Sequence, residues 1–274
     1  MTSIIFGDSF IGPFKLLKDK KLKIYKFKGA TLKGITKLEN KNRKKIETVV
    51  SNSNNIRCLI FIFGQVDLYF SYYYAKFIQN KRFLMEGMIK KYVEFISNLK
   101  CKQCNKLIFG IFPNPIKDKH IFNTLLSYNI LPENLINSID KKEKDRLSLH
   151  NFRFKMYIKF NKIIEKYCNI YNIKYINFDD VLLNKNNRVK DEFIIKESIY
   201  NIHLLWEPLI PIILQKINLC GLKKEYINNI NKSLNKYLNN KKREIKKKSK
   251  NKGKKLKKTK FTKKQKITYA NKIE

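Results

Sequence analysis

The chain begins Met1-Thr-Ser-Ile-Ile-Phe-Gly-Asp-Ser-Phe10, which places the triplet Gly7-Asp8-Ser9 directly after a short apolar run. Isoleucine-rich runs of this length are typical of a buried strand, and Gly7 permits the tight turn that must follow. From Phe10 to Lys18 apolar residues recur at helical spacing. The pattern predicts that Ser9 lies where a strand passes into a helix, near unpaired backbone N–H groups. That position suits a nucleophile, although a helix cap explains the triplet taken alone.

Further apolar runs predict strands, and helical patterns lie between them. The strands are expected at Ser3–Phe6, Leu22–Phe27, Arg57–Phe63, Lys106–Phe112 and Lys174–Phe178, and the helices at Phe10–Lys18, Thr31–Ser51, Ser71–Leu99, Leu147–Tyr171 and from Trp206 through Asn218. This alternation predicts an α/β protein with a parallel five-stranded sheet covered on both faces. Ile116–Lys144 is interpreted as an insertion, part helix and part loop. Active residues are expected at the carboxyl ends of the strands.

The charge of the chain is unevenly distributed. The formal net charge is +38 over 274 residues, and Lys241–Glu274 contains 17 Lys or Arg against two Glu. We therefore expect one domain over residues 1–220, a helical connector over 221–240 and a disordered Lys-rich tail over 241–274. Such a tail fits weak contact with nucleic acid or an anionic surface, nuclear targeting, or mere solubility. Without a leader pattern or a membrane-length apolar run, an intracellular, soluble protein is expected.

The five cysteines do not form the pattern of a disulfide framework. Cys101-Lys-Gln-Cys104 has the spacing of half a zinc site or a redox pair, but no second pair of Cys or His lies at matching spacing. We expect ordinary buried thiols and no metal.

Three later segments supply possible partners for Ser9. Gly29 follows the second predicted strand, Gly64-Gln65-Val66-Asp67 follows the third, and His203 precedes the last predicted helix. Glycines at strand ends let backbone N–H groups approach a ligand, and a histidine near a serine hydroxyl serves as a general base. Their order predicts a nucleophile, oxyanion donors and a base at one edge of the sheet. The aromatic run from Tyr69 to Tyr74 is interpreted as a helix face packed on the core.

Together these residues resemble the SGNH hydrolase superfamily, the GDSL-type esterases and lipases, over about residues 1–220. The resemblance implies a flavodoxin-like three-layer α/β/α sandwich and ester hydrolysis without metal or cofactor. Ser9 resembles the family's nucleophile and His203 its general base. Gly29, with Gly34 as a substitute, resembles the glycine that helps hold the oxyanion. Gly64 to Asp67 resembles the third block, usually Gly-x-Asn-Asp, with Asp67 fixing the loop.

The chain departs from that pattern at two positions. Val66 stands where the family has its oxyanion Asn, so Gln65 either supplies an amide donor or leaves backbone donors alone. Tyr200 stands where the family places the triad Asp. Asn201 is the expected substitute that orients His203, with Asp191 held in reserve and Glu207 a poorer candidate.

The primary hypothesis is a serine hydrolase that cleaves an ester, for example an acyl group on a sugar or lipid, through an acyl-enzyme. Two alternatives remain open at this stage. One is a catalytically degraded SGNH fold that only binds, suggested by Val66 and Tyr200. The other is a protein associated with nucleic acid or an anionic surface through residues 241–274.

Overall fold

The computed structural model describes residues 2–16, 20–101 and 103–218. The predicted connector over 221–240 and tail over 241–274 therefore lie outside the described residues, as does Cys220. In the described part no helix is both long and apolar enough to cross a membrane.

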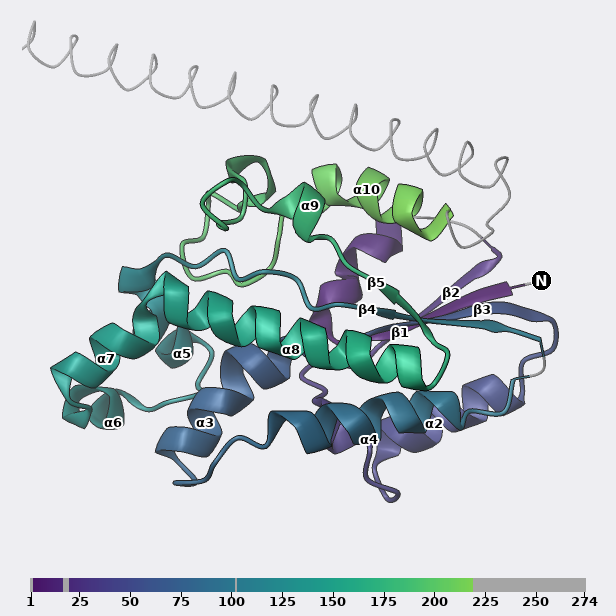
Figure 1. The fold of residues 1–274 in the computed structure, drawn as a ribbon, viewed down its shortest axis with the longest axis horizontal. Coiled ribbons are helices and arrows are strands. Elements are labelled where there is room, and N and C mark those ends of the chain that lie inside the picture. The colour runs from purple at the N-terminus through teal and green to yellow at the C-terminus, as the bar shows by residue number, and fades with distance from the viewer. Residues whose placement is uncertain (1, 17–19, 102, 219–274) are drawn as a thin grey trace, which may run out of the picture. The chain divides into compact units, whose positions relative to one another are not determined.

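The protein is an α/β structure with a five-stranded parallel sheet in the order β2-β1-β3-β4-β5 (Figure 1). This is the flavodoxin-like strand order. The strands are β1 (Thr2–Gly7), β2 (Leu22–Lys26), β3 (Ile56–Ile62), β4 (Asn105–Phe109) and β5 (Lys174–Ile176). All five predicted strands are present, and the predicted fold class is confirmed.

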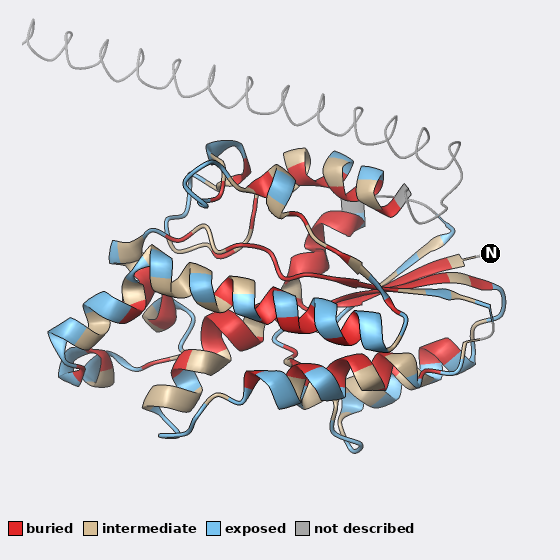
Figure 2. Ribbon diagram, in the orientation of Figure 1, coloured by how far each residue is buried: buried red, intermediate tan, exposed pale blue. Residues whose placement is uncertain are grey.

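Helices cover both faces of the sheet. The described helices are η1 (Ser9–Leu16), α1 (Leu32–Ile35), α2 (Lys41–Ser51), η2 (Asp67–Ser71), α3 (Tyr72–Phe77), α4 (Met85–Ser97), η3 (Asp118–His120), α5 (Ile121–Ser127), α6 (Glu133–Ser138), α7 (Lys141–Ser148), α8 (His150–Ile170), α9 (Asp179–Leu182), η4 (Asp191–Phe193) and α10 (Trp206–Asn218). In Figure 1, η1 and α10 lie on one side of the sheet, and α2, α4 and α8 lie on the other. Figure 2 shows the central strands β1, β3 and β4 and the inward helix faces mostly buried, whereas the edge strands β2 and β5 are more exposed.

The sheet is apolar on both faces because both are covered. In β1, Ile4, Ile5 and Phe6 are buried, and in β3 every residue from Cys58 to Ile62 is buried. Gly7 pairs with Lys26 of β2 and with Ile62 of β3, so the carboxyl ends of these three strands meet at one edge. The loops that begin at Asp8, Phe27 and Phe63 therefore start side by side.

Polar side chains decide where several elements end. β4 stops at Phe109, short of the predicted Phe112, because the backbone of Ile111 bonds to the Asn161 amide of α8 instead of a strand (N–Oδ1 2.9 Å). The single helix predicted over Thr31–Ser51 is two helices, since Asn40 caps a new helix by accepting from Asn42 N at 2.8 Å. The helix predicted over Ser71–Leu99 is likewise divided into α3 and α4.

The expectation of ordinary thiols was wrong for one pair. Cys101 and Cys104, both partly exposed between α4 and β4, form a disulfide, whereas Cys58 and Cys168 are buried. Cysteines three positions apart can form a disulfide when the backbone between them turns sharply, and Gln103 has φ +56°.

Candidate active site

Ser9 is the first residue of η1, immediately after the carboxyl end of β1. The turn is held on both sides, because Phe27 N donates to Gly7 O at 2.8 Å and Asp8 N donates to Ile62 O at 3.2 Å. Asp8 caps the helix, since its Oδ1 accepts from Phe10 N at 2.9 Å. The capping role is therefore filled by Asp8, which leaves the hydroxyl of the half-buried Ser9 available for other contacts.

Ser9, His203 and Asn201 form a continuous hydrogen-bonded chain, although they are 194 and two residues apart in sequence. His203 Nε2 lies 2.9 Å from Ser9 Oγ, and His203 Nδ1 lies 3.0 Å from Asn201 Oδ1. We call these three residues the candidate triad. Serine, base and orienting residue thus have the connectivity of a nucleophilic triad.

The backbone fixes the direction of these hydrogen bonds. Asn201 Oδ1 also accepts from the backbone N–H of His203 at 3.0 Å, so this atom must be the amide oxygen. An amide oxygen only accepts, and Nδ1 beside it therefore carries the imidazole proton. Nε2 is left as an acceptor, and the Ser9 hydroxyl donates to it. This is the tautomer that a general base requires.

Burial, with a smaller contribution from the positive charge of Lys26, lowers the pKa of His203 to about 4. The ring packs against Phe10 with centroids 4.6 Å apart, which removes water from one face. Nδ1 faces a neutral amide in place of the usual carboxylate. His203 is consequently neutral at pH 7, and its cationic form receives little electrostatic support from Asn201.

The two other acids considered for the triad do not replace Asn201. Asp191 begins η4 and lines the same cavity as Asn201, but in the described part of the chain no hydrogen bond joins it to His203. Glu207 is the second residue of α10. The structure thus brings together Ser9, His203 and Asn201 and leaves Asp191 at a neighbouring position.

The glycines expected near an oxyanion lie in turns beside Ser9. Gly29 has φ +71° and Gly64 has φ +115°, a region that other residues rarely adopt. Within the described ranges, no acceptor bonds the backbone N–H of Ser9 or of Gly29. The alternative, Gly34, donates its N–H to Thr31 Oγ1 at 3.0 Å and so is occupied as part of a helix cap.

Three polar side chains beside this edge are almost completely buried. Asp8, Gln65 and Asp67 expose 0%, 0% and 1% of their surface, and we call them the buried polar cluster. Asp67 Oδ2 accepts from Leu32 N at 2.8 Å, which ties the loop after β3 to the loop after β2. Among the described residues, Asp8 Oδ2, Asp67 Oδ1 and both amide atoms of Gln65 lack partners.

Burial raises the pKa values of both carboxyls in this cluster. The pKa of Asp8 rises to about 8, with a further contribution from the nearby charge of Asp67, and that of Asp67 rises to about 7. Backbone N–H groups oppose the shift, Phe10 at Asp8 and Leu32 at Asp67, without cancelling it. At neutral pH the site therefore lies beside carboxyls that hold protons for much of the time.

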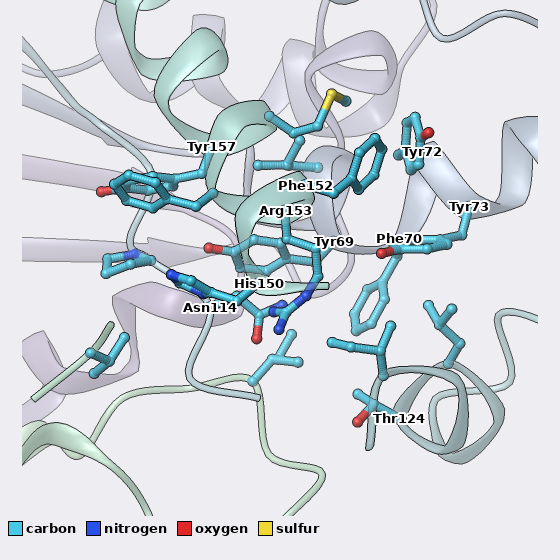
Figure 3. Close-up of a pocket in the computed structure, with 18 of the residues that line it drawn as sticks. Tyr69, Phe70, Tyr72, Tyr73, Asn114, Thr124, His150, Phe152, Arg153 and Tyr157 are labelled. Carbon is cyan, nitrogen blue, oxygen red and sulfur yellow. The ribbon is translucent and has the colours of Figure 1, made fainter. Parts of the chain in front are cut away.

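Two cavities that share lining residues lie near His203, since its chain neighbour Ile202 lines one and Asn201 lines the other. The narrow one, of about 40 Å³, is lined mainly by aromatic and aliphatic side chains; Figure 3 shows Asn114, His150 and the guanidinium of Arg153 toward one end and Phe70 and Tyr73 toward the other. The wider one, of about 600 Å³, has Asn201 in its wall. Asn114, His150 and Val189 line both.

Sequence reasoning missed His120 and His150, which line the wider cavity. No local pattern marks them, because the insertion and the chain after α9 bring them there. Tyr69, Phe70 and Tyr73 of the aromatic run are buried, in agreement with a packed helix face. No group of three or more His, Cys, Asp or Glu side chains placed to hold a metal occurs among the described residues.

No protein-family model and no curated protein matches the sequence. Solved structures do match. A GDSL-like lipase from Bacteroides thetaiotaomicron aligns with 80% of this chain and 88% of its own at 10% identity, with a TM-score of 0.51. A protein classed as an acylhydrolase from Bacteroides fragilis aligns with 85% of this chain and 88% of its own at 10% identity, with a TM-score of 0.50. The chain thus shares the fold of GDSL-type hydrolases, as the resemblance implied.

Proposed function

We propose that this protein is a divergent SGNH-type hydrolase that cleaves an ester by way of an acyl-enzyme on Ser9. The observation that carries the proposal is the hydrogen-bonded chain from Ser9 Oγ through His203 to Asn201 Oδ1. A helix cap does not explain it, because Asp8 already caps η1. The fold shared with a GDSL-like lipase supports the same chemistry, since that fold is used for it elsewhere.

The reaction follows from the tautomer. Ser9 Oγ attacks the ester carbonyl carbon while its proton moves to His203 Nε2, and the carbonyl oxygen becomes an oxyanion. The intermediate collapses, the carbon–alkoxide bond breaks, and Nε2 returns the proton to the leaving alcohol. A water molecule then gives a proton to Nε2 and attacks the acyl carbonyl carbon. The acyl C–Oγ bond breaks and Nε2 returns this proton to Oγ, which releases the carboxylic acid and restores Ser9.

The oxyanion is assigned to the unpaired N–H groups of Ser9 and Gly29 and to the Gln65 amide. Gln65 has no side-chain partner among the described residues, so its N–H groups are available without breaking another bond. Gly64 shapes the turn that carries Gln65, and Asp67 holds the Gly29 loop through Leu32. Preorganised donors of this kind contribute about 10²–10³-fold each.

Asn201 is expected to limit the turnover rate of the proposed enzyme. It orients His203 and fixes its tautomer, but it cannot stabilise the imidazolium by charge. This favours slow turnover. The same observation supports the second candidate, an SGNH-fold protein that binds an ester without cleaving it. Nucleic-acid contact through residues 241–274, nuclear targeting and an intracellular location stay predictions.

The decisive experiment combines turnover with covalent labelling. We expect the protein to hydrolyse short aryl esters and to react with a fluorophosphonate probe, and Ser9→Ala to abolish both. Ser51→Ala, an exposed serine on α2, is the matched control and leaves both unchanged. A folded wild-type protein that neither turns over esters nor is labelled between pH 5 and 9 supports the binding-only candidate.

A further inference from the structure

The wider cavity beside the candidate triad is lined by more positive than negative charge. Its charged lining consists of Lys117, Lys119, Arg188 and Lys196 against a single carboxylate, Asp191. Within the described ranges, none of the three lysines takes part in an ion pair. These cations are therefore available to a ligand.

The nearest ion pairs do not neutralise this excess of positive charge. Asp118 Oδ1 lies 2.7 Å from Arg153 and its Oδ2 lies 3.6 Å from Arg188, so one carboxylate serves two guanidinium groups. Arg153 is held more closely, since it also donates to Ile116 O at 3.0 Å. Arg188 is the outer, half-exposed partner and belongs to the cavity wall.

His150 lies close to two arginine side chains of this region. Its pKa is lowered by burial and then by the charges of Arg188 and Arg153, with Asp118 and a backbone contact from Asn187 opposing. His150 Nε2 has no partner among the described residues and lies at the junction of the two cavities. A neutral imidazole there remains able to donate or accept a hydrogen bond.

The cavity is connected to the chemistry through Asn201. Asn201 lines it and also bonds His203 Nδ1 at 3.0 Å, on the side of the imidazole away from Ser9. His120, with its ring against Tyr200 at 5.7 Å, lines the same wall. A ligand group in this cavity therefore lies beyond His203 from an ester bound at Ser9.

We propose that this cavity binds an anionic group on the ester substrate, a carboxylate or a phosphate placed several bonds from the scissile ester. The inference rests on the proposed function and adds to it a substrate class: esters that carry negative charge. Lys117, Lys119, Lys196 and Arg188 supply the attraction, which is strengthened by partial enclosure and weakened by salt. Because an isolated basic surface would serve any anion, the test must use position as well as charge.

Two matched substrates separate charge from reactivity. In 3-(4-acetoxyphenyl)propanoate and its carboxamide, two methylene groups insulate the phenyl ester from the terminal group, so the leaving groups are nearly equal. We expect kcat/KM for the carboxylate to exceed that for the carboxamide by about tenfold at low salt, and the ratio to fall toward one at about 0.5 M NaCl. A ratio of one at low salt overturns the proposal.

Charge reversal locates the effect. We expect Lys117→Glu with Lys196→Glu to reduce the carboxylate-to-carboxamide ratio at least tenfold while the carboxamide rate stays within about twofold. Lys45→Glu with Lys90→Glu makes the same change in net charge on α2 and α4, outside the cavity wall, and should leave the ratio unchanged. An equal fall in both double variants shows a general charge effect and overturns the proposal.

Binding to Ser9→Ala distinguishes the failure of this inference from the failure of the proposed function. If the wild-type protein turns over neither ester but Ser9→Ala binds the carboxylate at least tenfold more tightly than the carboxamide, and the Lys117/Lys196 reversal removes that preference, the cavity is assigned correctly and the hydrolase is not. Equal binding of both compounds overturns the inference whatever the activity. Including 2-(4-acetoxyphenyl)ethyl phosphate shows which anion is preferred.

Discussion

Two sets of polar side chains meet at the carboxyl edge of the sheet and differ in how their hydrogen bonds are satisfied. In the candidate triad, each group has a partner at 2.9–3.0 Å. In the buried polar cluster, Asp8, Gln65 and Asp67 are more deeply buried, yet four of their side-chain atoms have no partner among the described residues. Unpaired buried polar atoms cost free energy, so they are retained where another requirement outweighs stability.

We infer that the candidate triad and the buried polar cluster have different roles. Hydrogen bonds in the triad select one tautomer and one rotamer of His203, which is positioning for proton transfer. The Gln65 amide, by contrast, has no partner among the described residues, and the proposed mechanism gives it the oxyanion that exists only during reaction. Changes in the triad should therefore alter proton transfer and its pH dependence, and changes in the cluster should alter oxyanion stabilisation or folding stability.

The largest effect is expected at the base. His203→Ala should lower kcat/KM for a short aryl ester by about 10³–10⁴-fold, because Ser9 then has no proton acceptor. The measurement is steady-state hydrolysis at pH 7. Adding imidazole should restore part of the rate in this variant and leave the wild-type rate unchanged. A His203→Ala protein that keeps most of its activity would remove the triad from the mechanism.

A substitution at Gln65 should change catalytic activity and folding stability in different directions. Gln65→Leu should lower kcat/KM by about 10²-fold, since an oxyanion donor is lost. The thermal midpoint should stay the same or rise, because two unpaired buried atoms are removed. Adding Val66→Asn, which places an amide at the family's usual position, should recover part of the rate. Unchanged kcat/KM in Gln65→Leu would leave the oxyanion to backbone donors alone.

Asn201 tests what a carboxylate would add. Asn201→Asp should raise the pKa of His203 from about 4, because a neighbouring negative charge favours the imidazolium. Activity requires neutral His203, so the acid limb of kcat/KM should move from near pH 4 to higher pH. At pH 8 the rate should rise by about tenfold as the imidazolium in the transition state gains support. Asn201→Ala should lower the rate without moving the limb upward.

The smallest effect on catalysis is expected at Asp8, where stability should change instead. Its pKa is about 8 in the folded protein against 3.8 for the unperturbed group, so the folded state binds this proton more tightly than the unfolded state does. The stabilising contribution is complete below pH 3.8 and is lost as pH rises through 8. Asp8→Asn should raise the free energy of unfolding at pH 8 by about 1–3 kcal/mol and change it little near pH 4.

Denaturant unfolding at both pH values measures this difference. The exposed Asp145→Asn is the matched control and should leave the pH dependence of the wild-type protein intact. The wild-type protein is expected to lose stability between pH 4 and pH 8. If Asp8→Asn loses as much, Asp8 is not the group whose ionisation opposes folding.

Local patterns were sufficient for the number and order of the strands and for the positions of the glycine turns, although β4 and β5 end earlier than predicted. An apolar run such as Ser3–Phe6 has one way to bury both faces, and the structure extends it by only one residue at each end. Element boundaries were harder to predict. Asn40 begins α2 by capping it locally through Asn42 N, whereas the end of β4 depends on Asn161 of α8, which is distant in the sequence. The Cys101–Cys104 disulfide depends on the turn between them, which spacing alone does not reveal.

By itself the sequence determined the order of elements and the residues available for chemistry, since apolar periodicity and glycine placement are local properties of the chain. Only the tertiary structure decided which of those residues meet. It selected Asn201 over Asp191 beside His203, because the backbone N–H of His203 holds the Asn201 oxygen at Nδ1. It also gathered Lys117, Arg188 and Lys196 around one cavity, a juxtaposition of distant loops that no local pattern encodes.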